Sequence, residues 1–180
     1  IHASHIDFAK TRGSSLGSIN IVQDDDFLGH VIFRGSDGTD LATQSSRISG
    51  AVDGTPGSNT IPGRLEFYTQ STSGGSIAER ARITSGGVFK MPNNGKIELG
   101  GAQSGTGNIQ LYHSGSNGFL TSSTGFFRVA ATTTGGGLYL DGSSVFIRSE
   151  AGDENLARFI NDGAVELYHN NAKKFETTST

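Results

Sequence analysis

The sequence predicts an all-β protein made of many short strands. Short runs that alternate apolar and polar residues, rich in Phe, Ile, Val and Tyr, recur along the 180 residues, and a period of two is typical of half-buried strands. Helical spacing fits almost nowhere. Between the runs, Asn-Gly and Asp-Gly pairs indicate tight hairpin turns, because both residues of such a pair tolerate positive φ. The pairs begin at Asp37, Asp53, Asn94, Asn117, Asp141 and Asp162.

The expected strands follow one another along the whole chain. Each combines β-branched or aromatic residues with alternating polar ones, which suits a pleated, half-buried surface. In the N-terminal half they cover residues 5–10, 18–23, 30–35, 47–52, 64–69, 81–84 and 87–91. In the C-terminal half they cover residues 96–100, 108–113, 118–121, 126–130, 137–141, 144–149, 157–162, 164–169 and 173–177.

One segment, SIAERARIT at residues 76–84, fits both a helix and a strand. A helix would bring Ile77 and Ala81 onto one face. A strand places these two residues on one face together with Ile83, but Glu79 then falls on the apolar side. We expect a strand from Ala81 onward.

A change of composition near Pro92 divides the chain. All three prolines lie at or before this point, whereas closely spaced short runs and glycine clusters follow it. We therefore expect an N-terminal β domain over residues 1–91 and a repeat-containing β shaft over residues 92–180.

Within the expected shaft, one motif occurs twice, in residues 109–124 and 165–180. LYHSGSNGFLTSST and LYHNNAKKFETTST, which begin at Leu111 and Leu167, are identical at seven of fourteen positions without a gap. The variable centre of the motif predicts a solvent-exposed turn between two strands. We expect both copies to follow the same strand-turn-strand path.

The repeat also predicts which side chains face inward, because alternate residues of a strand share a face. We expect Leu111, Leu167, Phe119 and Phe175 to be buried. The inward face is expected to carry Ile109, Leu111 and His113 in the first copy and Val165, Leu167 and His169 in the second, with Tyr112 and Tyr168 on the opposite face.

A repeat of short strands cannot bury its own face and must stack on neighbouring repeats or on other chains. Two copies fit either a single-chain solenoid or several chains wound together, and the irregular spacing of the apolar runs disfavours the solenoid. We favour several chains wound together into an elongated rod. Strand edges that pair between chains would protect the many short edges.

Composition excludes several classes of function. The formal charge of −3 offers no basic surface for nucleic acid, and the absence of cysteine excludes disulfides and thiol chemistry. The most apolar run, residues 27–33, is too short to cross a bilayer, so no membrane insertion is expected. The sequence starts at Ile1 without a signal-like stretch, which suggests a piece of a longer polypeptide or a processed product.

Several segments together, about half of the chain, resemble the shaft and distal segments of tail fibres of tailed bacteriophages, of the marine phage type. The resemblance implies an elongated homotrimeric β-structured fibre on the virion, with intertwined β-structure or a triple β-helix in its C-terminal part. Such a fibre contributes to host attachment and has other tail proteins and a host glycan or receptor as partners. Such fibres often end in a self-cleaving chaperone domain. The segments are ASHIDFAKTRG, LGHVIFRGSDGTD, RISGAVDGTPGSNTIPGRLEFYTQ, AERARITSGGVFK and ARFINDGAVELYHNNAKKFETTST.

Acidic residues and histidines are candidates for a metal site. The run Asp24, Asp25 and Asp26, with Asp37 and Asp40 further on, offers the oxygen ligands that calcium prefers, but it lacks the spacing and central glycine of a calcium loop. We favour a solvated turn. Among the histidines, His2 and His5 do not complete a zinc site. His113 and His169 end the inward stripes; copies from three chains could hold an ion on the axis, although a hydrogen bond at a chain interface is the interpretation we favour.

Enzyme motifs are weak, and no catalytic residue, metal or cofactor is expected. Residues 13–17, GSSLG, match G-x-S-x-G, but a nucleophile elbow leads into a helix and a strand is expected next. Residues 135–137, GGG, lack the Lys and Ser/Thr of a phosphate loop. A glycan depolymerase spike is the less favoured enzyme hypothesis, and a monomeric carbohydrate-binding β-sandwich is the main alternative to a fibre. Sugar rings would stack on exposed tyrosines, for which the candidates are Tyr112, Tyr139 and Tyr168.

Overall fold

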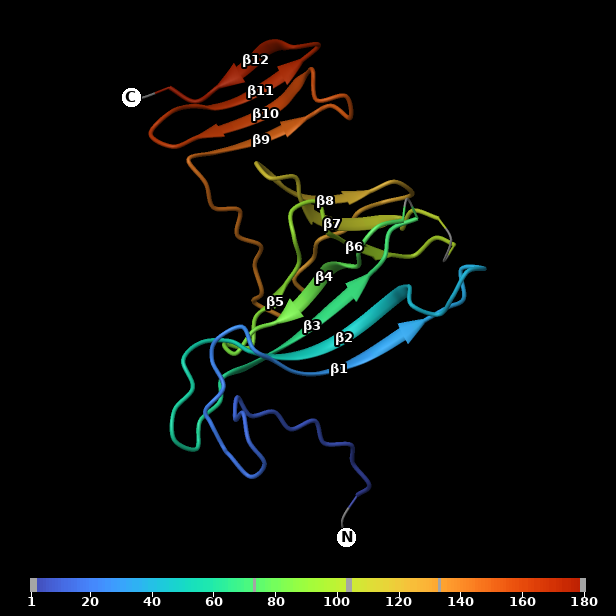
Figure 1. The fold of residues 1–180 in the computed structure, drawn as a ribbon. Helices are drawn as coiled ribbons and strands as arrows, with labels where there is room; N and C mark the ends of the chain where they lie inside the picture. The colour runs from blue at the N-terminus through green and yellow to red at the C-terminus, as the bar shows by residue number, and fades with distance from the viewer. Residues whose placement is uncertain (1–2, 73, 103–104, 133, 179–180) are drawn as a thin grey trace. The chain divides into compact units, whose positions relative to one another are not determined.

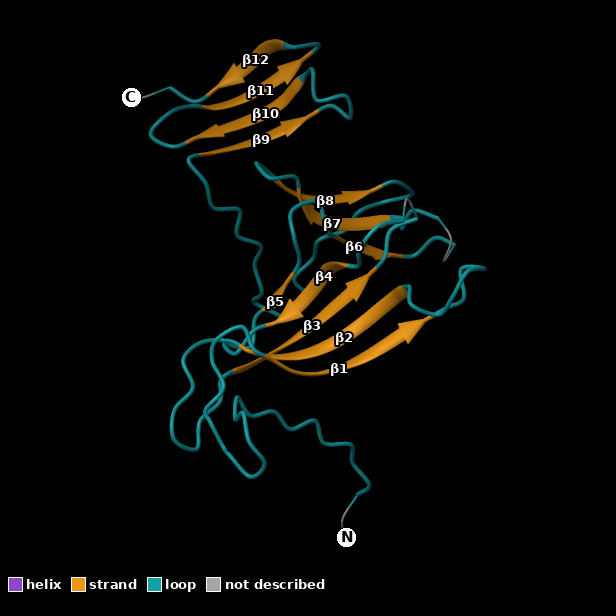
Figure 2. Ribbon diagram, viewed as in Figure 1, coloured by secondary structure: helices purple, strands orange, loops and turns teal. Residues whose placement is uncertain are grey.

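The structure, a computed structural model, describes residues 3–72, 74–102, 105–132 and 134–178. Over these residues the chain is all-β, with twelve strands in antiparallel sheets and no helix, hence none that could cross a membrane (Figures 1 and 2). It divides into two compact units, Ile1–Phe127 and Arg128–Thr180. The domain boundary expected near Pro92 stays a prediction; Pro92 lies in the first unit, between the strands of two different sheets.

The first unit contains a five-stranded sheet, here called the N-terminal sheet, whose strands lie side by side in chain order. Its strands are β1 (Phe27–Arg34), β2 (Gln44–Val52), β3 (Gly63–Thr69), β4 (Ala78–Ile83) and β5 (Phe89–Lys90). The register separates an apolar from a polar face. One row across the apolar face consists of Val31, Ile48, Phe67 and Ala81, and the next row, on the polar face, consists of His30, Ser49, Glu66 and Arg82.

A β-bulge in β4 resolves the position of Glu79. The partner of Phe67 is Ala81, but the partner of the next residue, Tyr68, is Glu79, so Arg80 is the extra residue. The bulge shifts the alternation by one residue and moves Glu79 onto the polar face, where regular alternation had placed it among apolar residues. The strand predicted from Ala81 onward therefore starts earlier than expected.

The first unit also contains a three-stranded sheet, here called the middle sheet, in the order β6-β7-β8. Its strands are β6 (Lys96–Leu99), β7 (Ile109–His113) and β8 (Gly118–Ser122). Ile97, Leu111 and Leu120 lie opposite one another on its apolar face. Lys96, Tyr112 and Phe119 form the neighbouring row on the other face.

The second unit contains a single sheet, here called the C-terminal sheet, in the order β12-β11-β10-β9. Its strands are β9 (Ser144–Arg148), β10 (Asn155–Ile160), β11 (Val165–His169) and β12 (Ala172–Glu176). The cross-strand partners place one set of apolar side chains on the same face. This set is Val145, Ile147, Ala157, Phe159, Val165, Leu167 and Phe175.

Most predicted strands are present, with ends displaced by at most three residues, but four are wrong. Residues 5–10, 18–23, 126–130 and 137–141 alternate as strands do and yet form no strand. Alternation reports an amphipathic chain, whereas a strand also needs a partner for its backbone. In residues 18–23, for example, the Asn20 N–H donates to the Thr11 hydroxyl at 2.8 Å rather than to a neighbouring strand.

The two copies of the repeat both form hairpins, but with different turns and registers. In the first copy His113 lies opposite Gly118, and an exposed four-residue loop connects them. In the second copy His169 lies opposite Ala172, and the two connecting residues, Asn170 and Asn171, have φ of 49° and 58°. This tight turn is the kind expected at Asn-Gly and Asp-Gly pairs, none of which has positive φ at both residues.

The different registers place the repeated phenylalanine on opposite faces. Phe119 pairs with Tyr112 on the polar side of the middle sheet. Phe175 pairs with Leu167 on the apolar face of the C-terminal sheet, because a bulge in β12 follows the tighter turn. The expectation that both copies keep the same inward face is therefore wrong at this position.

The hydrophobic core within one chain is very small. Leu111, Leu167 and Phe175, expected to be buried, are 51%, 46% and 56% exposed, and Phe119 is half-buried. Each sheet is a single layer, so its apolar face has little to bury against; on the N-terminal sheet the Phe8 side chain packs on Gly29. In the described part of the chain, the buried hydrophobic residues are Val22, Ala51, Val52 and Ala157.

Candidate functional site

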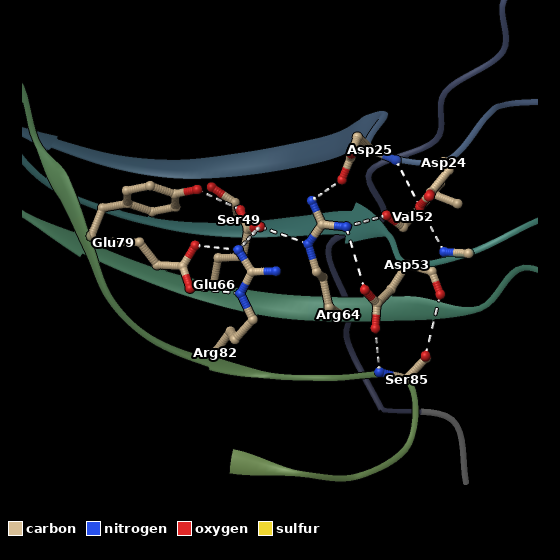
Figure 3. A network of polar contacts seen from close by, with 12 residues as sticks. Asp24, Asp25, Ser49, Val52, Asp53, Arg64, Glu66, Glu79, Arg82 and Ser85 are labelled. Carbon is tan, nitrogen blue, oxygen red and sulfur yellow. Dashed lines mark hydrogen bonds and ion pairs between the residues drawn. The ribbon is translucent and has the colours of Figure 1, made fainter. Parts of the chain in front are cut away.

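A buried polar cluster lies on the polar face of the N-terminal sheet (Figure 3). Glu66 on β3 is at its centre and only 1% exposed. Its carboxylate accepts hydrogen bonds from Arg64 Nε at 2.6 Å and from the Tyr68 hydroxyl at 2.7 Å, and Arg82 Nη2 lies 3.5 Å away. Burying a carboxylate is costly unless it is paired, so these donors allow the burial. Burial, together with Glu66, raises the pKa of Tyr68 and keeps its hydroxyl a donor.

Arg64 connects this cluster to two loops. Its Nη2 lies 2.8 Å from Asp25, and its Nη1 donates to the Val52 carbonyl at 2.5 Å and lies 3.5 Å from Asp53. Asp53 accepts a 2.7 Å hydrogen bond from the Ser85 backbone N–H, and the bonds from Ser85 lower the pKa of Asp53. One guanidinium therefore holds the end of the sheet and the loops around it in one arrangement (Figure 3).

Arg47 stacks on aromatic rings beside this cluster. The Arg47 guanidinium lies 4.1 Å from the ring centroid of Tyr68 and 5.1 Å from that of Phe27, which is within the range of cation–π attraction. The ring centroids of His30 and Phe27 are 4.8 Å apart, and the Nδ1 of His30 is 3.0 Å from the Ser49 hydroxyl. Burial, and then the charge of Arg47, lower the pKa of His30, which favours the neutral ring.

The acidic run is not a simple solvated turn. Asp26 is buried, 8% exposed, and its carboxylate lies 2.7 Å from Arg12 and 3.2 Å from Lys10. The hydrogen bond from Arg12, followed by that from the Gln23 N–H, holds the pKa of Asp26 well below its ordinary value. The run therefore anchors the N-terminal segment. Among the described residues, no group of three His, Asp or Glu side chains is placed to hold a metal ion.

The C-terminal sheet repeats the polar arrangement of the N-terminal sheet. The Tyr168 hydroxyl donates to Glu166 at 2.6 Å, two residues earlier on the strand, as Tyr68 does to Glu66. Arg158 Nη1 lies 3.3 Å from Glu166, and its guanidinium lies 5.3 Å from the centroid of Phe146. The hydrogen bond from Tyr168, with help from Lys173, lowers the pKa of Glu166.

The middle sheet has a related arrangement with an amide in place of the carboxylate. Lys96 donates to Gln110 at 2.9 Å, and Gln110 donates to Glu98 at 2.9 Å. Lys96 also lies 5.0 Å from the centroid of Tyr112, whose ring stacks on Phe119 at 4.9 Å.

The same four-residue strand pattern occurs in all three sheets. The sequence analysis identified two of its copies and missed the third. The shared pattern is an apolar residue, Glu or Gln, a second apolar residue and Tyr, and it could have been found by comparing these tetrapeptides. The three copies are Leu65-Glu66-Phe67-Tyr68, Ile109-Gln110-Leu111-Tyr112 and Val165-Glu166-Leu167-Tyr168. In each copy the polar pair faces one side of its sheet and the apolar pair faces the other.

The tyrosines proposed for sugar stacking differ in their surroundings. Tyr112 and Tyr168 are half-buried and already contact Phe119 and Glu166, respectively. Tyr139 is 85% exposed and belongs to no strand. Tyr112 and Tyr168 therefore each have a partner within their own sheet.

The candidate histidines lie at strand ends or in the N-terminal segment. His113 and His169 end the apolar stripes of different sheets, and both are exposed. The Nδ1 of His113 accepts a hydrogen bond from the Gly115 N–H at 3.1 Å. His5 lies 3.2 Å from Asp7, and His2 lies outside the described residues.

The glycine-rich enzyme motifs lie in turns. In residues 13–17, the Ser15 carbonyl accepts a hydrogen bond from the Ser18 N–H at 3.1 Å, and Gly17 has φ of 79°. Neither a strand nor a helix follows, so this serine is not positioned as in a nucleophile elbow. Residues 135–137 likewise belong to no strand or helix.

The apolar faces of the three sheets are the other prominent feature. Their large side chains remain exposed although they line up across neighbouring strands. On the N-terminal sheet these are Val31, Phe33, Ile48, Leu65, Ile83 and Phe89; on the middle sheet Ile97, Leu99, Leu111 and Leu120; on the C-terminal sheet Ile147, Phe159, Leu167 and Phe175. Contiguous apolar surface of this extent marks an interaction site.

In the polar clusters the charge of each carboxylate is balanced locally, because Glu66 and Glu166 each contact an arginine and a tyrosine. Such clusters stiffen one face of a sheet and leave the apolar face as the surface able to bind a partner. Comparison with known proteins adds no assignment: no protein-family model matches the chain, and no curated protein matches it.

Proposed function

We propose that this chain is a structural, non-enzymatic segment of a tail fibre of a tailed bacteriophage. It works as an elongated homotrimer on the virion, outside the cell, where it projects the fibre and contributes to host attachment. Its partners are two further copies of itself, other tail proteins, and a host surface glycan or receptor. The proposal rests on the sequence resemblance to phage fibres and on one structural observation, the large total surface that a single chain leaves exposed, which includes the apolar faces of its sheets.

The exposed surface of the chain is much larger than that of a compact monomer. The chain exposes 13863 Å², whereas a compact monomer of this mass exposes about 8,300 Å². Dividing the mass between two separate compact units in proportion to their lengths raises that expectation only to about 9,800 Å². The excess of roughly 4,000 Å² is several times the roughly 800 Å² per partner of an ordinary interface. An assembly in which each copy contacts two others supplies the missing cover.

The alternative of a monomeric carbohydrate-binding sandwich is less favoured. A sandwich buries the inner faces of two sheets against each other. Here Leu65 on the N-terminal sheet and Leu120 on the middle sheet are both exposed, although both sheets belong to the first unit.

A depolymerase is also less favoured. Glycoside cleavage uses two carboxyl groups on either side of the scissile bond. The two carboxylates at the centres of the polar clusters, Glu66 and Glu166, are each paired with a cation.

The mass of the purified chain in solution tests the proposal. Light scattering should give about 56 kDa, three times the chain mass of 18.8 kDa, and unfolding and dissociation should be one event. Immunogold labelling of the native particle should place the chain on the tail fibre. A stably folded species near 18.8 kDa would contradict the trimer, and labelling away from the fibre would contradict the location.

A further inference from the structure

We propose that the apolar face of the C-terminal sheet is the surface that docks against other copies of this chain, and that its polar face stays toward solvent. This inference rests on the proposed function and adds to it the face that each copy uses. In the described part of the second unit this is the one sheet, and the large side chains on its apolar face are exposed.

The second unit has no interior of its own. The hydrophobic residue buried in its described part is Ala157, which is too small to form a core. Ile147, Phe159, Leu167 and Phe175 lie on one face and are 41–56% exposed. A single layer with an uncovered apolar face is marginal in water, so a permanent partner must cover this face for the sheet to persist.

The polar face needs no such cover. Glu166 already contacts Tyr168, Arg158 and Lys173, and Phe146 lies beneath the Arg158 guanidinium. Covering this face would remove several charged groups from water, which costs free energy unless new partners replace the water. Docking through the apolar face therefore lowers the free energy, whereas docking through the polar face raises it.

Face-to-face docking is favoured over pairing of strand edges. The edge strand β12 carries Lys173 and Lys174, and lysines on an edge strand oppose the addition of another strand. Chains that pair through the β12 edge would have to place these charges along the joint.

A second copy is the occupant that these observations favour. The side chains aligned across this face are apolar except for His169 at its end, as in obligate interfaces, whereas transient partners bind more polar surfaces. The sheet also needs its cover in order to fold, so the partner must be present at synthesis, as another copy is. An identical apolar face from each of two further copies matches it in chemistry and size.

Two neighbouring residues on β12 provide a matched test. Phe175 lies opposite Leu167 on the apolar face, and Glu176 lies opposite Glu166 on the polar face. In one chain their exposures are similar, 56% and 44%. Because the chain contains no cysteine, Phe175→Cys and Glu176→Cys each introduce one thiol, whose reaction with a maleimide can be followed in the native and the unfolded protein.

In the native trimer, the Phe175→Cys thiol should react at least tenfold more slowly than the Glu176→Cys thiol, and unfolding should make the two rates equal. Leu167→Cys, on the same apolar face, should also be protected and serves if Phe175→Cys fails to assemble. Equal rates within an assembly of three chains would overturn the face assignment and leave the proposed function standing.

Two further outcomes would show that something other than a second copy covers this face. A protein of single-chain mass with a protected thiol at position 175 would mean that the chain covers the face itself. A protein of single-chain mass with both thiols reactive would assign the face to an external partner. Either result overturns this inference and the trimer together.

Discussion

The Tyr168 hydroxyl donates a 2.6 Å hydrogen bond to Glu166, two residues earlier on the same strand, and Tyr68 donates one of 2.7 Å to Glu66 in the N-terminal sheet. Residues separated by two positions lie side by side on one face of a strand, so the short pattern Glu-x-Tyr brings its partners together without tertiary help. The two copies differ in burial, because Glu66 is buried and Glu166 is half-buried. That difference makes them a natural pair for measurement.

Tyr68→Phe should destabilise the protein more than Tyr168→Phe. A hydrogen bond to a charged group contributes about 1.5–3 kcal/mol, and the loss at Tyr68 should fall in this range because Glu66 is hidden from water. At Tyr168, water and Lys173 can replace part of the lost bond. Urea unfolding of both variants measures the difference, and equal losses would show that burial is not what separates the two sites.

Glu66→Ala should reduce the free energy of unfolding by about 1–3 kcal/mol, because it removes the acceptor of the buried Arg64 Nε and of the Tyr68 hydroxyl. Arg64, whose side chain is 6% exposed, keeps Asp25 and Asp53 as partners, so its charge is not left isolated. Glu176→Ala, at an exposed carboxylate, is the control and should change stability by about 0.5 kcal/mol or less. A small effect at both positions would mean that the cluster around Glu66 is hydrated in solution.

Phe119→Ala and Tyr112→Ala should destabilise the middle sheet to a similar extent and not additively. Their rings stack at 4.9 Å with an interplanar angle of 15°, and aromatic pairs contribute about 0.5–1.5 kcal/mol beyond their buried area. A double-mutant cycle should show coupling of this size. Additive effects would mean that the stacking contributes nothing measurable. The sequence predicted a large contrast between the two variants, since it placed the rings on opposite faces.

Asp26→Asn should release the N-terminal segment. Asp26 holds Lys10 and Arg12, so trypsin should cut after both residues several times faster in the variant, as measured by mass spectrometry of the early products. Asp141→Asn, at an exposed loop residue, is the control. Because the pKa of Asp26 is lowered in the folded protein, its stabilising contribution is present above the ordinary value of 3.8. That contribution is lost as the pH falls below 3.8. Unchanged cleavage at neutral pH would argue against this anchor.

Mild acid should destabilise the protein through His30. Burial and then Arg47 lower its pKa, with Lys10 acting in the same direction and Glu66 opposing. Above the ordinary value of 6.5 the ring is neutral in both states; below it the unfolded chain takes up a proton that the folded chain resists. The urea concentration at the unfolding midpoint should therefore decrease as the pH is lowered below about 6.5. His30→Gln should lessen that fall, and an identical profile in the variant would exclude His30 as its source.

The sequence by itself determined the all-β class and the position of twelve strands, because alternation is a local property of side chains along one strand. It also identified the residues of β7 and β11 that share a face, such as Leu167 and His169. What it overestimated was the number of strands, as residues 18–23 show, because a strand depends on a partner that alternation does not report.

Only the tertiary structure decided which side chains meet across strands. The repeated phenylalanine shows why: Phe119 and Phe175 occupy the same position in the motif, yet a four-residue loop in one copy and the Asn170-Asn171 turn with a bulge in the other send them to opposite faces. In the same way, a bulge at Arg80 moves Glu79 to the polar face. A shift of one residue in register reverses every side chain beyond it. The register depends on turn geometry and cross-strand packing, which are properties of residues that meet only in the folded chain.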